Sequence, residues 1–319
     1  MIEVKNLTKR YGNHLAVDHL NFTVESGKIY GFLGPNGAGK STTMNIMTGY
    51  LGATEGQVLI DGHDILKEPE EAKKNIGYLP EIPPLYMEMT VREYLEFAAE
   101  LKGIKKDKRE PQIEEVIRLA KLRAVENRLI QNLSKGYKQR VGLAQAVLGF
   151  PEIIILDEPT VGLDPKQIIE IRELIRKLAK KHTVILSSHI LAEVREVCDY
   201  IMIISGGKLV ASDTTENLEN MMSGKGQIEV EAKAPRDEMD HIIRRTGKIK
   251  EVKYRTSASG ITTAQITAKG GEDIREELFL AFSHADVPML TLNQSKTTLE
   301  EIFLELTQGS GNRMIKEEK

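Results

Sequence analysis

Near the start of the chain, apolar and polar residues alternate in short runs, which is the pattern of half-buried strands. These runs are IEVKNL, LNFTV, KIYGFLG and GQVLIDG, and turn-forming residues separate them. Between the last two runs, a glycine-rich loop leads into STTMNIMTGYL, whose apolar residues recur at helical spacing. The start of the chain therefore predicts strands with one loop-to-helix transition among them.

The pattern becomes helical in the middle of the chain, after the strand-like IGYLPE. TVREYLEFAAELKG, QIEEVIRLAKL and YKQRVGLAQAVLG each repeat apolar residues every three or four positions. They are followed by the apolar run EIIILD, the amphipathic PKQIIEIRELIRKLAKK and the strand-like TVILSSH. Because alternating strands and helices favour a parallel sheet, we expect an α/β domain with a helical subdomain inserted at about residues 82–150.

A second change of pattern follows the hairpin-like DYIMIISGGKLVASD. The segment MSGKGQ is small and polar, and we place a domain boundary there, so that the first domain spans residues 1–222. The runs beyond it have the order strand, helix, strand, strand, helix, strand, which is typical of a ferredoxin-like α+β sandwich, and a helix in TTLEEIFLELT follows. We expect this accessory domain at residues 223–308 and a disordered tail at residues 309–319.

Length and composition agree with two domains. The chain has 319 residues, and a single core usually stops growing at roughly 250–300 residues. Its net charge of −3, from 44 basic and 47 acidic residues, gives no reason to expect nucleic acid as a partner. The single cysteine, Cys198, lies in an apolar-patterned stretch and is expected to be a buried thiol. No stretch approaches the roughly 18–20 apolar residues that a membrane span needs.

The glycine-rich loop carries the clearest chemistry. GPNGAGKS satisfies G-x-x-x-x-G-K-[ST] and stands between a predicted strand and a predicted helix, as a phosphate-binding loop requires. Lys40 would reach the β- and γ-phosphates of ATP, and Ser41 would ligate Mg²⁺. The alternative is a strand-to-helix turn with a solvated lysine. The residues predicted to bind ATP are Gly34, Pro35, Asn36, Gly37, Ala38, Gly39, Lys40, Ser41 and Thr42.

Two acidic residues end the apolar run IIILDEP. An apolar strand that ends in a carboxylate can deliver that carboxylate to a metal at the sheet edge, so Asp157 is predicted to bind Mg²⁺. Glu158 follows, and a carboxylate beside a metal-bound triphosphate can polarise the attacking water, which makes it the candidate general base. Alone, the pair could simply end a strand before Pro159, but beside a phosphate loop it indicates hydrolysis.

Two further side chains have open interpretations. His189, in SSHIL, ends a predicted strand and could bind the γ-phosphate and hold the water, although a strand-end histidine is more often structural. Tyr11 lies on a predicted turn and could stack on adenine, or it could be a packed tyrosine of an edge strand.

Together these motifs resemble the ATP-binding subunit of an ABC transporter. The resemblance covers residues 1–222 and rests on GPNGAGKS, IIILDEP, VGLDP and SSHIL in the family's order. It implies a P-loop ABC ATPase fold with an N-terminal antiparallel β subdomain. It also implies that LSKGY, at residues 133–137, is the signature that contacts the γ-phosphate of ATP held by the opposite subunit. The residues implied for that contact are Ser134, Lys135, Gly136 and Tyr137.

The same resemblance implies further roles. Tyr11 would be the adenine platform, His189 the γ-phosphate contact, and Asp164 a carboxylate at the dimer interface. Glu81, in IGYLPE, stands where the family has a glutamine that senses magnesium and the membrane subunit. A carboxylate can still ligate Mg²⁺ but, when ionised, cannot donate a hydrogen bond to the attacking water.

The signature also departs from the commoner LSGGQ. Lys135 and Tyr137 stand where that sequence has glycine and glutamine, so the contact of the glutamine side chain is lost and Lys135 adds positive charge. With IGYLPE and the C-terminal domain, LSKGYKQR resembles the exporter branch of gliding-motility and multidrug type. This branch implies a peripheral subunit at the cytoplasmic face of the membrane, a dimer with itself or a homologous ATPase subunit, and a separate transmembrane permease.

Two other functions use the same ATPase engine. One is an ATPase that remodels a ribosome or DNA complex; such relatives usually carry a second cassette or a long coiled-coil insert, which this chain lacks. The other is a regulatory module that binds ATP without hydrolysing it, which the intact catalytic residues argue against. Neither the cargo nor the permease can be identified. The resemblance implies that the permease binds the segment after IGYLPE, where PPLYM at residues 83–87 is apolar and proline-rich; the alternative is a loop that packs locally.

Overall fold

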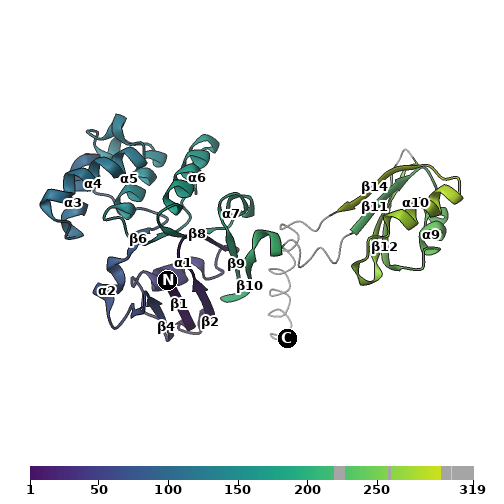
Figure 1. The fold of residues 1–319 in the computed structure, drawn as a ribbon, viewed down its shortest axis with the longest axis horizontal. Coiled ribbons are helices and arrows are strands. Elements are labelled where there is room, and N and C mark those ends of the chain that lie inside the picture. The colour runs from purple at the N-terminus through teal and green to yellow at the C-terminus, as the bar shows by residue number, and fades with distance from the viewer. Residues whose placement is uncertain (219–226, 258–259, 296–302, 304–319) are drawn as a thin grey trace. The chain divides into compact units, whose positions relative to one another are not determined.

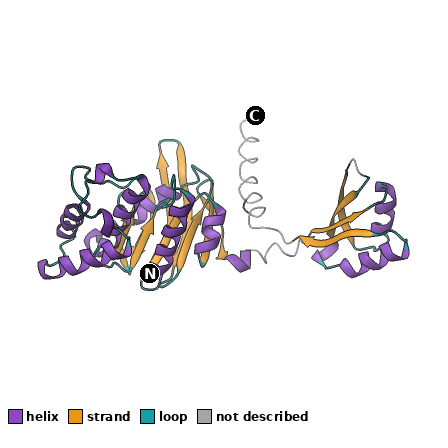
Figure 2. Ribbon diagram, turned by 90° about the horizontal axis from the view of Figure 1, so that it is seen from above, coloured by secondary structure: helices purple, strands orange, loops and turns teal. Residues whose placement is uncertain are grey.

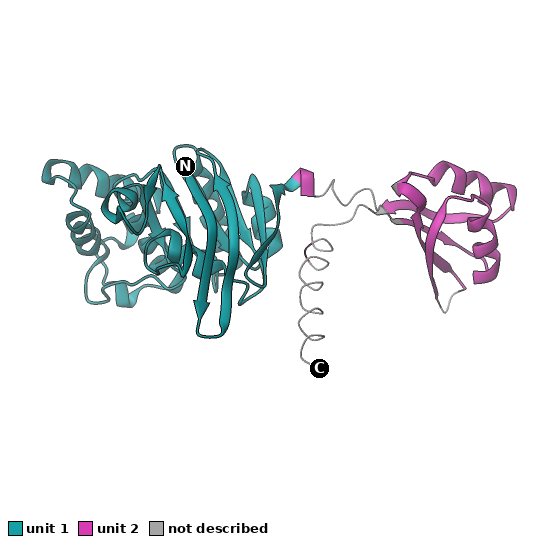
Figure 3. Cartoon of the chain, turned by 90° about the horizontal axis from the view of Figure 1, so that it is seen from below, with its two compact units in different colours: residues 1–215, 306–319 teal, residues 216–305 magenta. Residues whose placement is uncertain are grey.

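The computed structural model describes residues 1–218, 227–257, 260–295 and 303. It divides into two compact units, separated between Thr215 and Glu216 (Figure 3). The boundary expected after residue 222, most of the helix expected in TTLEEIFLELT and the expected tail at residues 309–319 lie outside the described residues.

The first unit begins with an antiparallel sheet whose strands have the order β2-β1-β4-β5. Two residues with positive φ, Asn6 and His19, lie at the register shifts between β1 and β2. This sheet is the antiparallel β subdomain that the sequence predicted. Its strands are β1 (Ile2–Tyr11), β2 (His14–Val24), β4 (Glu55–Ile60) and β5 (His63–Asp64).

A second sheet of the first unit has the order β10-β9-β3-β8-β7-β6. The strands from β9 to β6 are parallel, and β10 pairs antiparallel with β9 through the turn at Gly206 and Gly207. The continuous apolar runs therefore form buried parallel strands, as predicted. Their bounds are β3 (Ile29–Leu33), β6 (Ile76–Leu79), β7 (Ile153–Leu156), β8 (Thr183–Ser188), β9 (Tyr200–Ser205) and β10 (Lys208–Thr214).

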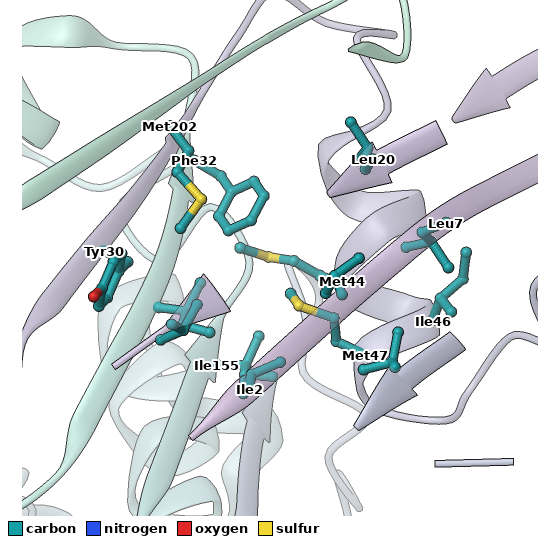
Figure 4. Packing of buried hydrophobic residues seen from close by; sticks show 14 of the residues in the cluster. Ile2, Leu7, Leu20, Tyr30, Phe32, Met44, Ile46, Met47, Ile155 and Met202 are labelled. Carbon is teal, nitrogen blue, oxygen red and sulfur yellow. The ribbon is translucent and has the colours of Figure 1, made fainter. Parts of the chain in front are cut away.

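One core joins these two sheets around helix α1 (Lys40–Met47). Met44 and Met47 of the helix lie among side chains from both sheets, including Ile2 and Ile155 (Figure 4). Each fully buried side chain of this size contributes about 1.5–3 kcal/mol. The helix that follows the glycine-rich loop is thus anchored from two sides, which fixes where the loop ends.

Three packed helices form the inserted subdomain (Figure 1). Thr90 caps the first of them, because its side chain accepts from the Glu93 N–H while the Glu93 carboxylate accepts from the Thr90 N–H. The second helix begins at Lys106 and includes Pro111, whereas the sequence predicted a start just after that proline. The helices are α3 (Val91–Leu101), α4 (Lys106–Leu119) and α5 (Lys135–Val147), with short 3₁₀ turns at Arg123–Val125 and Ile130–Asn132.

Three further helices complete the first unit: α2 (Pro69–Lys74), α6 (Pro165–Ala179) and α7 (Leu191–Val197). The sequence predicted α6 from its amphipathic pattern, but α7 was seen only as an apolar-patterned stretch. Cys198 follows α7 and is buried, as expected, and this burial raises the pKa of its thiol.

The second unit consists of a four-stranded antiparallel sheet with two helices on one of its faces (Figure 2). Its strand order, β12-β13-β11-β14, with the chain order βαββαβ, confirms the predicted ferredoxin-like sandwich. Ile228 and Val230 point into its core, while Glu229 and Glu231 alternate with them. Its elements are β11 (Gln227–Ala232), α9 (Arg236–Arg244), β12 (Ile249–Thr256), β13 (Thr262–Ala268), α10 (Arg275–His284) and β14 (Met289–Ser295).

Across the described ranges, no helix combines the length and apolar character that crossing a membrane requires.

Candidate active site

Four neighbouring parallel strands bring the predicted motifs to one edge of the sheet. Strand β8 lies between β3 and β7, and β6 lies beyond β7. The glycine-rich loop follows β3, Asp157 and Glu158 follow β7, His189 follows β8, and Glu81 lies two residues beyond β6. Because the carboxyl ends of parallel strands meet at the same edge, residues far apart in the chain converge here.

The glycine-rich loop holds its lysine close to its own backbone. Gly39 has φ 103°, and a Cβ there would lie 2.5 Å from the Ala16 carbonyl oxygen, so only glycine fits before α1. The Lys40 Nζ donates to the carbonyl oxygens of Gly34, at 2.7 Å, and Pro35, at 3.2 Å. With 5% of its surface exposed, Lys40 is a buried cation that faces the loop.

The two acidic residues after β7 have different partners. Asp157 accepts hydrogen bonds from the Ser41 hydroxyl, at 3.2 Å, and from the Ser187 hydroxyl, at 2.6 Å. Glu158 lies between two cationic or potentially cationic groups, with Lys40 Nζ at 3.6 Å and His189 Nδ1 at 3.0 Å. Asp157 is therefore joined to the serine predicted to hold Mg²⁺, and Glu158 to the predicted γ-phosphate contacts.

Ser187 was not recognised from the sequence. Its hydroxyl donates to the Asp157 carboxylate and accepts from the Glu158 N–H at 2.8 Å, so one side chain orients both acidic residues. This support matters because Glu158 has φ 47°, which is unfavourable for a residue with a side chain. The signal was the first serine of SSH, on the strand between the two motifs, but only strand order shows its partners.

Most of the predicted site residues line a pocket of about 470 Å³, a volume within the usual range for small-molecule sites, whereas Gly34, Pro35 and Asp157 do not line it. Tyr11 lines it and is half exposed, with Lys9 Nζ 5.3 Å from its ring centroid. His14, Ala16 and Val161 were not predicted as part of the site. The full lining is Tyr11, His14, Ala16, Asn36, Gly37, Ala38, Gly39, Lys40, Ser41, Thr42, Glu81, Glu158, Val161 and His189.

Comparisons with known proteins agree with this geometry. The family described as "ABC transporter" matches residues 17–161. The bacitracin transport ATP-binding protein BcrA of Bacillus licheniformis is 43% identical over 221 residues, which are 69% of this chain and 71% of that protein. The chain belongs to the ABC transporter ATP-binding family.

Two further similarities extend this ABC cassette assignment. The linearmycin resistance ATP-binding protein LnrL of Bacillus subtilis is 31% identical over 308 residues, 96% of this chain and 98% of that protein, so this similarity includes most of the second unit. The dimeric post-hydrolysis structure of the cassette MJ0796, bound to ADP and Pi, is 28% identical with a TM-score of 0.61 over 67% of this chain and 98% of that one. The chain is thus an ABC ATPase of known cassette fold.

The predicted signature of this ABC ATPase is not part of its pocket lining. Among the described residues that line the pocket, none comes from residues 133–137. Ser134 caps α5 by accepting from the Tyr137 N–H at 3.4 Å, and the buried Gly136 lies so close to Gln167 that a Cβ would be 2.4 Å from its Oε1. The structure therefore brings together the phosphate loop, the acidic residues and His189, whereas residues 133–137 do not line the pocket.

Two departures from the common signature have neighbours within the chain. The Lys135 side chain lies against Gly162, and the Tyr137 ring has the Arg140 guanidinium 5.9 Å from its centroid. Arg140 itself forms an ion pair with Glu170 of α6. Asp164, the residue implied at the dimer interface, caps α6 by accepting from the Gln167 N–H at 2.9 Å.

Proposed function

We propose that this chain is the ATP-hydrolysing subunit that powers an exporter, through ATP-driven pairing of two cassettes coupled to a separate transmembrane subunit. The observation that carries the proposal is that none of residues 133–137 lines the pocket that holds the candidate base. One chain supplies a pocket with a candidate base, but the start of α5, which carries the predicted signature, does not line that pocket. Two chains, arranged reciprocally, would each complete the site of the other.

Magnesium fits the oxygen ligands on the pocket floor. The Ser41 hydroxyl and the Asp157 carboxylate are hard donors 3.2 Å apart, and Glu81 lines the same pocket. No cluster of three or more His, Cys, Asp or Glu that could hold a metal occurs among the described residues, in keeping with an ion that relies on phosphate oxygens. When bound, Mg²⁺ would neutralise charge on the phosphates during transfer.

The hydrolytic roles follow from the contacts of Glu158 and His189. Glu158 would accept a proton from the attacking water, because its carboxylate is held in place at the phosphate-facing edge of the sheet. His189, whose Nδ1 is bonded to Glu158, would contact the γ-phosphate and keep the water between them. Lys40 would exchange its carbonyl partners for phosphate oxygens.

The signature would complete this site from the opposite chain. Ser134 offers a hydroxyl at the start of α5, where the helix dipole favours an anion. Lys135 is exposed beside it and adds a positive charge. The γ-phosphate of ATP bound to the partner chain would therefore meet a hydroxyl, backbone N–H groups and an ammonium.

The proposed transmembrane subunit would bind the segment after Glu81. Ile82, Tyr86 and Met87 are exposed apolar residues that follow directly on the pocket lining. Binding there would place the subunit at the cytoplasmic face of the membrane. Because BcrA is a bacitracin transport protein and LnrL a linearmycin resistance protein, we propose an antibiotic or drug as the class of cargo. Remodelling of a ribosome or DNA complex remains the second candidate function.

The shared site can be tested by measuring Mg²⁺-dependent ATP hydrolysis over a range of protein concentrations. If two half-sites make one catalyst, the rate rises more than linearly with concentration. Full specific activity down to a dilute monomer, checked by size-exclusion chromatography with light scattering, would exclude the shared site. Purification from gently solubilised membranes then separates the two functions: an integral membrane protein should come with the chain, whereas ribosomal or DNA complexes would favour the second candidate.

A further inference from the structure

A buried carboxylate outside the pocket connects the two catalytic segments. Glu193, on α7, is 7% exposed, and its Oε2 accepts hydrogen bonds from the hydroxyls of Thr160, at 2.6 Å, and Ser188, at 3.1 Å. Its Oε1 lies 3.9 Å from a guanidinium nitrogen of Arg172. A carboxylate is costly to bury unless it is paired and hydrogen-bonded, so three partners at one site indicate a defined role.

The two hydroxyls belong to the segments that carry Glu158 and His189. Thr160 lies two residues after Glu158, and Ser188 directly precedes His189. The Ser188 hydroxyl also accepts from the Ile190 N–H at 3.0 Å, which fixes the backbone on the other side of the histidine. Glu193 does not line the pocket, so it can influence the reaction only through these neighbours.

Glu158 needs such support because of its backbone. At φ 47° it is held in a conformation that costs about 1–3 kcal/mol for a residue with a side chain, and neighbours must fix such a conformation. Ser187 binds the N–H of Glu158, and the Val161 N–H donates to its carbonyl at 3.2 Å. Thr160 lies between Glu158 and Val161, and its bond to Glu193 anchors this turn through a residue that does not line the pocket.

We propose that Glu193 is a positioning residue for ATP hydrolysis. It holds the turn after Glu158 and the end of β8 in one fixed relation, so that the Glu158 carboxylate and the His189 imidazole keep their 3.0 Å contact. Arg172 balances its charge from α6. The inference rests on the proposed roles of Glu158 and His189, and Glu193 itself touches neither substrate nor metal.

The test is the steady-state kinetics of Glu193→Ala at saturating Mg²⁺ and varied ATP. With both hydroxyls unanchored, kcat should fall by about 10- to 100-fold, the range for a small misplacement of catalytic groups. KM and the affinity for a fluorescent ATP analogue should stay near wild type, because the phosphate loop is untouched. Glu193→Gln keeps one oxygen that can accept from both hydroxyls, so it should recover most of the lost kcat.

Glu196→Ala is the matched control. Glu196 is exposed on the same helix and pairs with the same Arg172, but it has no bond to Thr160 or Ser188. This variant should retain wild-type kcat. Equal losses in Glu196→Ala and Glu193→Ala would overturn the proposal, because they would point to Arg172 or to helix stability instead.

Three other results would also overturn it. One is a wild-type kcat for folded Glu193→Ala, and another is a loss in which KM and nucleotide affinity change together. If Glu193→Ala does not fold, Thr160→Val and Ser188→Ala are measured instead, because each removes one of the two hydroxyls. A wild-type kcat in both of these variants is the third result. Glu158→Gln, measured alongside, separates the two hypotheses: if it is inactive while Glu193→Ala is normal, only the positioning role fails, and if it turns over normally, the proposed base fails.

Discussion

The two halves of the proposed composite site are built in opposite ways. The pocket half, which comprises Gly34–Ser41, Asp157, Glu158 and His189, is tied together by bonds between its own members, and most of its charged side chains are buried. The signature half, residues 133–137, exposes Ser134 and Lys135; Ser134 caps α5, while Gly136 packs against Gln167 of α6. The pocket half is thus preorganised within one chain. The signature half instead exposes polar groups that, in the proposed composite site, would bind a ligand held by another chain.

The largest effect is expected from the pocket half, in Lys40→Ala. The variant removes the buried ammonium that the loop directs toward phosphate, so ATP binding should be lost. A fluorescent ATP analogue measures this directly. Lys28→Ala is the control. Lys28 is a partly exposed lysine directly before β3, and Glu25 is its only ion-pair partner among the described carboxylates. Tight ATP binding by Lys40→Ala would contradict the assignment of the loop.

Glu158→Gln should separate binding from hydrolysis within the pocket half. The amide keeps the size of the side chain but cannot take a proton, so turnover should fall by about 10²–10⁴-fold while ATP and Mg²⁺ still bind. ATP should then hold two chains together, which size-exclusion chromatography with light scattering would detect. Normal turnover would place the base elsewhere, with His189 as the next candidate because it is the residue bonded to Glu158.

The pocket half was also the half that sequence could predict. Each of its motifs ends a strand, so a parallel sheet alone brings Lys40, Asp157 and His189 together. Ser187 and Glu193 could not be predicted, because their partners Asp157, Glu158 and Thr160 lie 29 to 33 residues away in the chain. Their importance depends on the order β3-β8-β7 and on a helix, α7, that the pattern did not reveal.

Other parts of the fold show what local pattern can and cannot give. The ferredoxin-like order of the second unit followed from its strands and helices alone, since their sequence order limits the topology. The start of α4 was predicted too late because Pro111 was treated as a boundary. In the structure that proline is the sixth residue of the helix, so the helix continues through it with the loss of one i→i−4 hydrogen bond.

Ser134→Ala tests the role of the signature half. It should leave ATP binding by a dilute monomer unchanged, because Ser134 does not line the pocket of its own chain. At protein concentrations that allow pairing, kcat should fall by about 10²–10³-fold, as expected for removing one donor from a charged transition state. An effect on ATP binding by the monomer, or no effect on kcat, would argue against a role in trans.

Thr90→Ala controls for the helix cap. Thr90 caps α3 as Ser134 caps α5, so each variant should lower the free energy of unfolding by about 0.5–2 kcal/mol. Thermal denaturation would show similar shifts for both variants. Only Ser134→Ala should then lose hydrolysis, which separates contact with phosphate from simple destabilisation of a helix.

The smallest effect on the isolated subunit is expected from the segment that follows Glu81. Tyr86 is 51% exposed, and its ring lies 5.2 Å from that of Phe97 and 6.3 Å from that of Tyr94, both on α3. The structure thus gives Tyr86 a packing contact as well as an exposed face. Tyr86→Asp could therefore lose membrane association by disrupting the packing contact or by changing the exposed face, so a second position is needed.

Ile82→Asp supplies that position, because Ile82 is 83% exposed in the same segment. If the segment binds the transmembrane subunit, both variants should keep near-normal basal hydrolysis and lose membrane association and stimulation by the partner. If the segment only packs locally, Tyr86→Asp should lower the melting temperature and basal activity, while Ile82→Asp should change neither these nor membrane association. The docking role is then decided by Ile82→Asp, since a side chain so exposed has little packing within the chain to lose.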